Sequence, residues 1–139
     1  MGNVFAEITV KNAADLALSL KGQIAEQDIR TVTLIAIVDT GATTLVINED
    51  IFNQLGLTVL EKRMINLAGG AKMECKVTDA VHIHWKNRFA AVSAVVLPEG
   101  KPLLGVIPLE FMDLIVDPIR QELVGAHGDE ALLMAMQAT

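Results

Sequence analysis

The chain has 139 residues, enough for one domain with a modest core, and 52% of them are hydrophobic, which is high for this size. A net charge of −6 argues against general nucleic-acid binding, which relies on Lys and Arg to displace counterions from phosphates. No stretch reaches the roughly 20 apolar residues of a membrane-spanning helix, and the first residues lack the pattern of a signal peptide. The single cysteine, Cys75, permits no internal disulfide, so we expect a cytoplasmic protein without membrane contact.

The first third of the chain predicts strands that lead to an acidic residue. Residues 5–10 alternate between apolar and polar side chains, the period of a strand. Residues 16–20 carry leucine at every second position and predict another strand in the same way. Residues 32–38, which are almost entirely apolar, then predict a buried strand that ends at Asp39.

The middle of the chain predicts one short helix followed by long strands. Asn48 is a suitable N-cap for a helix that ends at Gly56, because Asn accepts a hydrogen bond from the first turn and Gly permits the left-handed C-cap. Residues 57–67 and 73–85 predict two strands joined by a tight turn at a Gly-Gly pair. Residues 89–97 predict a further strand.

The last third predicts a second short helix and a closing strand. Pro108 suits the first turn of a helix over residues 109–114, since its missing N–H is not needed there. Residues 121–124 predict the closing strand. The pattern as a whole predicts one mostly-β domain over residues 1–124, and the Ala, Leu and Met content of the tail, 125–139, favours a helix.

The junction at the end of the predicted buried strand carries the chemistry. A lone carboxylate is costly to desolvate, so Asp39 in such a place needs hydrogen-bond donors, a charge partner or a chemical role. Thr40 supplies a hydroxyl that fixes the turn, and Gly41 lets another backbone or a ligand come close. An alternative is a purely structural turn in which Asp39 caps its own backbone.

Residues 39–42, Asp-Thr-Gly-Ala between hydrophobic strands, resemble the active-site signature of the retroviral-type (retropepsin-like) aspartic proteases. Residues 103–106, Leu-Leu-Gly-Val, resemble the second motif of that family, a hydrophobic pair followed by Gly and a short helix. Residues 67–72, Leu-Ala-Gly-Gly-Ala-Lys, lie where the family carries its flap. The resemblance implies a retropepsin-like closed β-barrel, one half of an acid protease, with one or two short helices. Its nearest relatives are expected among the small bacterial proteins of this class.

The resemblance also implies roles for individual residues. Asp39 is the expected catalytic carboxylate, Thr40 the hydroxyl that bonds across a dimer, and Gly41 the residue that lies against the substrate backbone. The expected substrate-binding residues belong to the floor, the flap and the second motif: Ala42, Thr43, Thr44, Leu67, Ala68, Gly69, Gly70, Ala71, Leu103, Leu104, Gly105, Val106 and Ile107. The implied activity is that of an aspartic endopeptidase acting on a peptide or protein, with no cofactor and no metal.

Peptide hydrolysis by carboxylates requires two of them. They share one proton, because like charges about 3 Å apart cannot both ionise. No other Asp of the chain is followed by a Thr-Gly or Ser-Gly turn, and 139 residues cannot hold the two lobes of a pepsin-like enzyme. We therefore expect the second carboxylate to be Asp39 of a second copy, in a homodimer with its two-fold axis between the two acids.

The sequence also allows other interpretations of its function and of its histidines. The flap candidate lacks an aromatic residue, which favours a catalytically weak or inactive peptide-binding or dimerisation module. His82 and His84 share one face of a predicted strand, and Cys75 could join them as a metal site, although zinc sites use three or four closely spaced ligands. An exposed strand face is the simpler interpretation of the two histidines. The intact Asp39 signature favours the enzyme.

Overall fold

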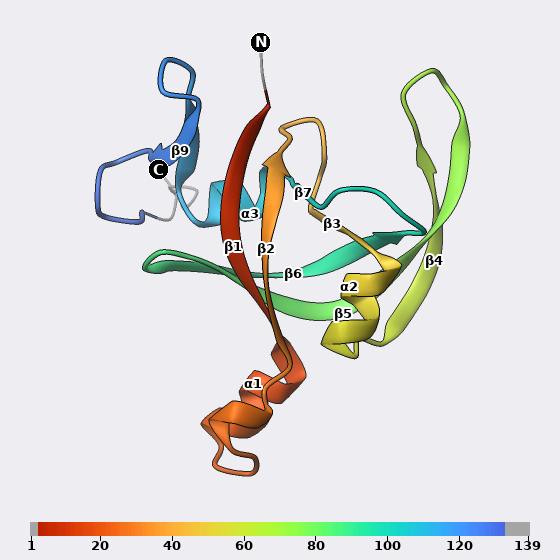
Figure 1. Cartoon of the computed structure of the whole chain (residues 1–139), viewed down its shortest axis with the longest axis vertical. Coiled ribbons are helices and arrows are strands. Elements are labelled where there is room, and N and C mark those ends of the chain that lie inside the picture. Colours follow the sequence, from red (N-terminus) through yellow and green to blue (C-terminus); the bar gives the residue numbers. More distant parts are fainter. Residues whose placement is uncertain (1–2, 133–139) are drawn as a thin grey trace, which may run out of the picture.

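The computed structural model describes residues 3–132, in which strands dominate over short helices (Figure 1). Its elements, in chain order, are β1 (Val4–Asn12), α1 (Ala13–Leu20), the 3₁₀ helix η1 (Glu26–Asp28), β2 (Thr31–Val38), β3 (Leu45–Asn48), α2 (Glu49–Leu55), β4 (Val59–Asn66), β5 (Lys72–Trp85), β6 (Arg88–Leu97), β7 (Leu103–Leu104), α3 (Val106–Phe111), β8 (Leu114–Asp117) and β9 (Glu122–Gly125). The mostly-β prediction is therefore confirmed.

Seven of these strands form one sheet in the order β1-β2-β7-β3-β6-β5-β4. β1 pairs antiparallel with both β2 and β5, so the sheet curls back on itself and closes. β4 is left at the free end, where it pairs with β5 to form a hairpin that extends away from the closed part (Figure 1). The remaining two strands, β8 and β9, form a separate antiparallel pair.

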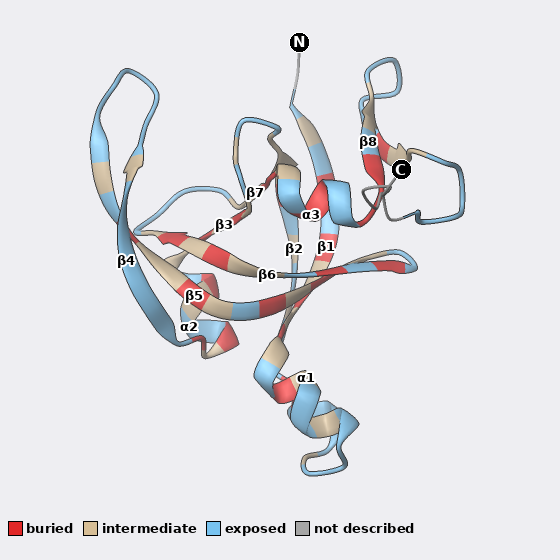
Figure 2. Cartoon of the chain, turned by 180° about the vertical axis from the view of Figure 1, so that it is seen from behind, coloured by how far each residue is buried: buried red, intermediate tan, exposed pale blue. Residues whose placement is uncertain are grey.

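The hydrophobic core lies inside the closed part of the sheet. Alternate residues of β1, namely Ala6, Ile8 and Val10, point into it and are at most 5% exposed. Figure 2 shows this alternation as buried and exposed bands along the strands, while β4 remains almost entirely exposed. Burying a Val or Ile side chain contributes about 1.5–3 kcal/mol, so this alternation fixes which face of each strand points inward.

β2 differs from its prediction as a fully buried strand. Its side chains alternate instead, with Ala36 fully buried and Ile35 61% exposed. The reason is that the outer face of the β1–β2 pair is not covered by another layer within the described residues (Figure 2). A continuous apolar run did not distinguish a strand covered on both faces from one covered on a single face.

Residues 16–20 form part of helix α1 and not the predicted strand. The side chain of Asn12 accepts a hydrogen bond from the backbone N–H of Asp15 at 3.0 Å and caps the helix. The alternating leucines misled the prediction, since Leu20 is 80% exposed and packs on nothing that would require strand period. The cap residue and the acid three positions later were the informative signal.

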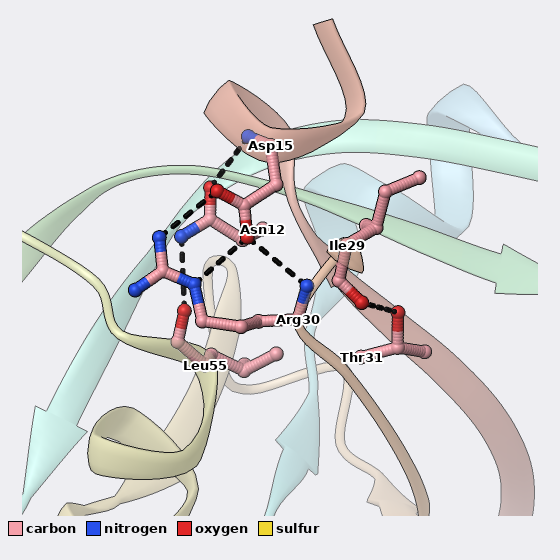
Figure 3. Close-up of polar contacts among 6 residues, drawn as sticks. All are labelled: Asn12, Asp15, Ile29, Arg30, Thr31 and Leu55. Atoms are coloured by element: carbon pink, nitrogen blue, oxygen red, sulfur yellow. Dashed lines mark hydrogen bonds and ion pairs between the residues drawn. The ribbon is translucent and has the colours of Figure 1, made fainter. Parts of the chain in front are cut away.

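α1 and η1 are fastened to the sheet by a polar cluster (Figure 3). The carboxylate of Asp15 accepts hydrogen bonds from Nε of Arg30 at 2.8 Å, from Nη2 at 2.9 Å and from the Arg30 backbone N–H at 3.0 Å. Asn12 adds a hydrogen bond from its side-chain amide to the carbonyl of Leu55 at 2.9 Å. The hydrogen bonds from Arg30 hold the pKa of the Asp15 carboxyl below its ordinary value, against the opposing effect of burial.

Among the later elements, α2, β4, β5, β6 and β9 lie close to their predicted positions, α3 is shifted, and the short strands β7 and β8 were not predicted. Asn48 caps α2 through Ile51 N–H at 3.0 Å, and Gly56 ends the helix in the left-handed region at φ +60°. α3 spans Val106–Phe111 and begins three residues before the predicted start, because Gly105 and not Pro108 precedes the first turn. The predicted helix of the C-terminal tail falls largely on residues 133–139, which lie outside the described residues.

The far end of α3 is held by a buried guanidinium. Arg88, 5% exposed, donates from Nη1 to the carbonyls of Met112 at 2.9 Å and Asp113 at 2.7 Å, and from Nη2 to that of Gly128 at 2.5 Å. The carboxylate of Asp113 lies 2.7 Å from Nδ1 of His127, and this hydrogen bond lowers the pKa of Asp113. Arg88 thus joins β6, the end of α3 and the turn after β9.

We expect Asp15→Asn to destabilise the fold by about 1–3 kcal/mol at pH 7, because it removes the charge from a carboxylate that accepts several hydrogen bonds. The pKa of Asp15 is lowered in the folded state, so its contribution is present above the unfolded-state pKa and is lost as the pH falls through the folded value. Urea unfolding of both proteins from pH 7 down to about pH 2 measures this. A stability difference that stays constant over that range would contradict the role of the charge.

Candidate active site

The loop after β2 carries the Asp-Thr-Gly triplet and is shaped by its own backbone. The N–H of Asp39 donates to the carbonyl of Leu104 at 3.0 Å, and its carbonyl accepts from the N–H of Ala42 at 3.1 Å. The carboxylate accepts the N–H of Gly41 at 2.8 Å, which is the capping contact of the structural alternative. The same contact fixes the carboxylate in place, so it suits a catalytic acid as well. Thr40 lies exposed beside it.

The second motif holds this loop from below. β7 (Leu103–Leu104) lies between β2 and β3 in the sheet, directly under the loop that joins them. The first turn of α3 then donates two backbone hydrogen bonds of 2.9 Å, from Val106 to the carbonyl of Ala42 and from Ile107 to that of Thr43. The second motif therefore supports the loop through main-chain contacts.

Gly105 is the point of closest approach between the two motifs. A Cβ atom there would overlap the carbonyl oxygen of Thr44 and would lie 2.6 Å from that of Ala42. The φ of Gly105 is −92°, which any residue can adopt. The glycine is thus required for space and not for backbone conformation.

A cleft of about 560 Å³ lies between the loop and the β4–β5 hairpin. It is lined by Asp39, Gly41, Ala42, Thr43, Thr44, Val46, Ile65, Asn66, Leu67, Ala68, Val95, Leu97 and Leu103. In both views of the molecule the hairpin tip and the β2–β3 loop point toward the same end (Figures 1 and 2). Asp39 is the one charged side chain among the described residues of this lining.

A second cleft of about 620 Å³ adjoins the first and shares Thr43, Thr44, Ile65 and Val95 with it. Its other lining residues are Leu60, Glu61, Arg63, Met64, Cys75, Val77, Val92, Ser93 and Ile107. The hydroxyl of Thr44 donates to the carbonyl of Ser93 at 2.8 Å and ties the loop to β6 at this junction. The shared residues make the two clefts one groove under the hairpin.

The structure brings most of the predicted site residues to this groove. Gly69, Gly70 and Ala71 form the hairpin turn outside the lining, with both glycines at φ +87°. Thr40 lies outside the lining too, and Leu104, Gly105 and Val106 support the loop from behind it. Sequence reasoning missed lining residues of β3, β4 and β6, chiefly Val46, Asn66, Val95 and Leu97. Strand alternation indicates which residues of β6 share a face, but it does not indicate which of the two faces lines the groove.

A family model described as "Aspartyl protease" matches residues 17–111, which include the Asp-Thr-Gly loop, the hairpin and the second motif. The chain belongs to this aspartic protease family. No sequence among curated proteins matches it.

The structure is similar to that of EIAV protease solved in complex with the inhibitor HBY-793. The TM-score is 0.51 at 20% sequence identity, and the match covers 75% of this chain and 82% of that one. At this identity the similarity concerns the fold. Together with the family match, it makes the chain a retropepsin-like aspartic protease family member, as the sequence motifs indicated.

The histidine pair of β5 lies apart from the groove lining. His82 stacks on Phe89 with ring centroids 5.4 Å apart, and His84 lies 5.9 Å from His82. Partial burial, with a smaller effect of Lys11, lowers the pKa of both imidazoles. Residues 3–132 contain no group of three or more His, Cys, Asp or Glu side chains arranged to hold a metal ion. In the same range no helix is long and apolar enough to cross a bilayer.

We expect Gly105→Ala to destabilise the protein more than Gly70→Ala does, because its Cβ overlaps the backbone of the Asp39 loop. At Gly70 the added Cβ meets open space and costs about 1 kcal/mol for the positive φ alone. Thermal unfolding of the two variants compares them. Equal losses of stability would show that the close approach of the loop backbone does not exclude a Cβ atom at position 105.

Proposed function

We propose that the protein is an aspartic endopeptidase, active as a homodimer in which Asp39 of each copy contributes one carboxylate. The observation that carries this proposal is the position of Asp39, on a loop held by backbone hydrogen bonds at one wall of a mainly apolar groove. A groove under a β-hairpin suits an extended peptide, which can pair with strand edges. The family match supports protease chemistry at this loop.

A second copy supplies what one chain lacks. Glu61 is the other acid of the groove lining, but it belongs to the adjoining cleft and is paired with Arg63. The exposed position of Thr40 suits a hydroxyl that bonds to the facing loop across a two-fold axis. Half-exposed apolar residues such as Phe5 and Ile115 provide surface for such an interface.

The chemistry then follows from one shared proton. The ionised carboxylate takes a proton from water as the oxygen attacks the peptide carbonyl, while the protonated one donates its proton to the carbonyl oxygen. Collapse of the tetrahedral intermediate breaks the C–N bond, and a carboxyl returns a proton to the leaving amine. Gly41 leaves room for the substrate backbone beside the acid. The hairpin, on the other side of the groove, excludes water from the reacting groups.

A peptide-binding module without cleavage is the second candidate. The observation in its favour is the turn of the hairpin, which carries Leu, Ala and Gly and no aromatic side chain to close over the groove. Such a module would bind an extended peptide saturably and leave it intact. The single cysteine, Cys75, is consistent with either function in the cytoplasm.

We expect Asp39→Asn to abolish cleavage while leaving the fold nearly intact, because the amide can keep the hydrogen bond from Gly41 but cannot take a proton from water. Purified wild type and variant are incubated with a denatured peptide mixture from mildly acid to neutral pH, and new termini are read by mass spectrometry. Cleavage by the wild type is expected to peak on the acid side of neutrality, where the pair retains one proton. Equal cleavage by the variant would reject the mechanism.

The two-chain site predicts a further result with mixed proteins. When wild type and Asp39→Asn are unfolded together in equal amounts and refolded, random pairing leaves about half of the wild-type chains with a wild-type partner. Activity per wild-type chain is therefore expected to fall by about half. Unchanged activity in the mixture would mean that one chain suffices.

A Thr40→Ala variant, refolded alone, is expected to dimerise more weakly, because it lacks the hydroxyl that bonds to the facing loop. Analytical ultracentrifugation measures this.

A further inference from the structure

One feature of the groove is left unused by the chemistry at Asp39. The edge strand β4 contributes Leu60, Glu61, Arg63, Met64 and Ile65 to the groove lining. Of these, Glu61, Arg63 and Ile65 stand at alternate positions, so their side chains share one face of the strand. Arg63 brings the one positive charge among the described residues that line the two clefts. Nη2 of Arg63 lies 2.5 Å from Oε1 of Glu61.

This ion pair contributes little to folding. The side chains of Arg63 and Glu61 are 67% and 46% exposed, and pairs so exposed stabilise proteins by only about 0–1 kcal/mol. A guanidinium has five N–H donors in a planar fork, and Glu61 engages one of its nitrogens. Donors therefore remain for a ligand, and the contact with Glu61 holds the guanidinium along the strand beside the cleft.

The surroundings of Arg63 define what such a ligand looks like. Most of the remaining lining is aliphatic, including Val77, Val92, Val95 and Ile107. In an extended peptide, side chains two residues apart point to the same side. A peptide that places an aliphatic side chain on these residues therefore brings the side chain two positions away close to the same wall of the groove.

The hairpin also differs in charge from the rest of the molecule. Residues 59–76 contain four basic and two acidic side chains, within a chain of net charge −6. One of the basic residues, Lys76, is engaged by Glu49 at 2.6 Å. An acidic ligand is thus repelled by most of the protein, including Asp39 and Glu61 of the groove, and finds its favourable contact in the groove at Arg63.

We propose that Arg63 is a specificity-determining residue that selects substrates with Asp or Glu two positions from an aliphatic residue. Its guanidinium binds the substrate carboxylate through the donors that Glu61 leaves free, and the negative charge of Glu61 opposes the incoming carboxylate. This inference rests on the proposed function, since it assigns a substrate class to the same groove.

The test uses labelled decapeptides with four central aliphatic residues and Glu, Gln or Lys placed at each flanking position in turn. Binding is measured by fluorescence anisotropy to the Asp39→Asn protein near pH 6, where Glu is ionised and no peptide is cut. We expect the Glu peptide to bind about three- to tenfold more tightly than its Gln counterpart at one flanking position, as for one charge-assisted hydrogen bond at a partly exposed site.

Three added substitutions separate specificity from structure. Arg63→Gln is expected to abolish the preference for the Glu peptide over the Gln peptide, and Glu61→Gln to increase that preference. Lys62→Gln, which removes an equal charge from the neighbouring position outside the lining, is the matched control and is expected to keep the preference.

Each outcome has a distinct meaning. Equal binding of the Glu and Gln peptides at every position, or a preference that survives Arg63→Gln, overturns the role of Arg63 and leaves the proposed function standing. A loss of the preference in Lys62→Gln as large as in Arg63→Gln overturns it too, because net charge alone would then explain selection. If no peptide binds and the wild type cuts none, the proposed function fails and this inference fails with it.

Discussion

The main-chain contacts between the Asp39 loop and the segment around Gly105 are the constraint on which the site depends. A loop between two strands would ordinarily be mobile, yet here its carbonyl groups are bound by the first turn of α3 and its start is bound to β7. These contacts require two backbones to lie closer than a Cβ allows, so one glycine decides whether the loop is held. The carboxylate gains a fixed position without a salt bridge to any cation within residues 3–132.

α3 transmits this support because it is fixed at both ends. Its N-terminal turn binds the Asp39 loop, and the carbonyl of Met112 just past its last turn is bound by the buried guanidinium of Arg88. A helix of six residues has little stability of its own, since nucleation is costly and few internal hydrogen bonds repay it. Packing of its buried Pro108 and Leu109 against the core supplies the rest. The packing of α3 on the core thus keeps the Asp39 loop ordered.

The sequence predicted the fold well where local chemistry and packing agree. The cap at Asn48 and the glycine pair of the hairpin each demand one local structure, and the structure has it. The predictions failed where a local pattern had two explanations. Leucine at every second position of residues 16–20 mimics a strand, while the helix comes from the cap at Asn12 and the tertiary contact of Asp15 with Arg30.

The candidate site shows the same division. The motifs located Asp39 and its support, because the Asp-Thr-Gly triplet and the glycine required for space can be recognised in the sequence. The groove wall formed by Val95 and Leu97 could not be found in this way, since an aliphatic residue on β6 looks alike whichever face it occupies. The facing of β6 depends on its parallel pairing with β3, a contact between segments about fifty residues apart.

The closure of the sheet through β1 and β5 separates two regions of the chain that can change independently. Helix α1 and η1 leave the sheet at the end opposite the Asp39 loop and the hairpin turn (Figure 1). The turn between them, residues 21–25, is mostly exposed, and Gly22 has open space around it. An insertion at this turn would lengthen a segment whose two ends are already held by the hydrogen bonds of Asn12, Asp15 and Arg30. The molecule therefore offers a site for inserting a fluorescent or affinity tag far from the groove.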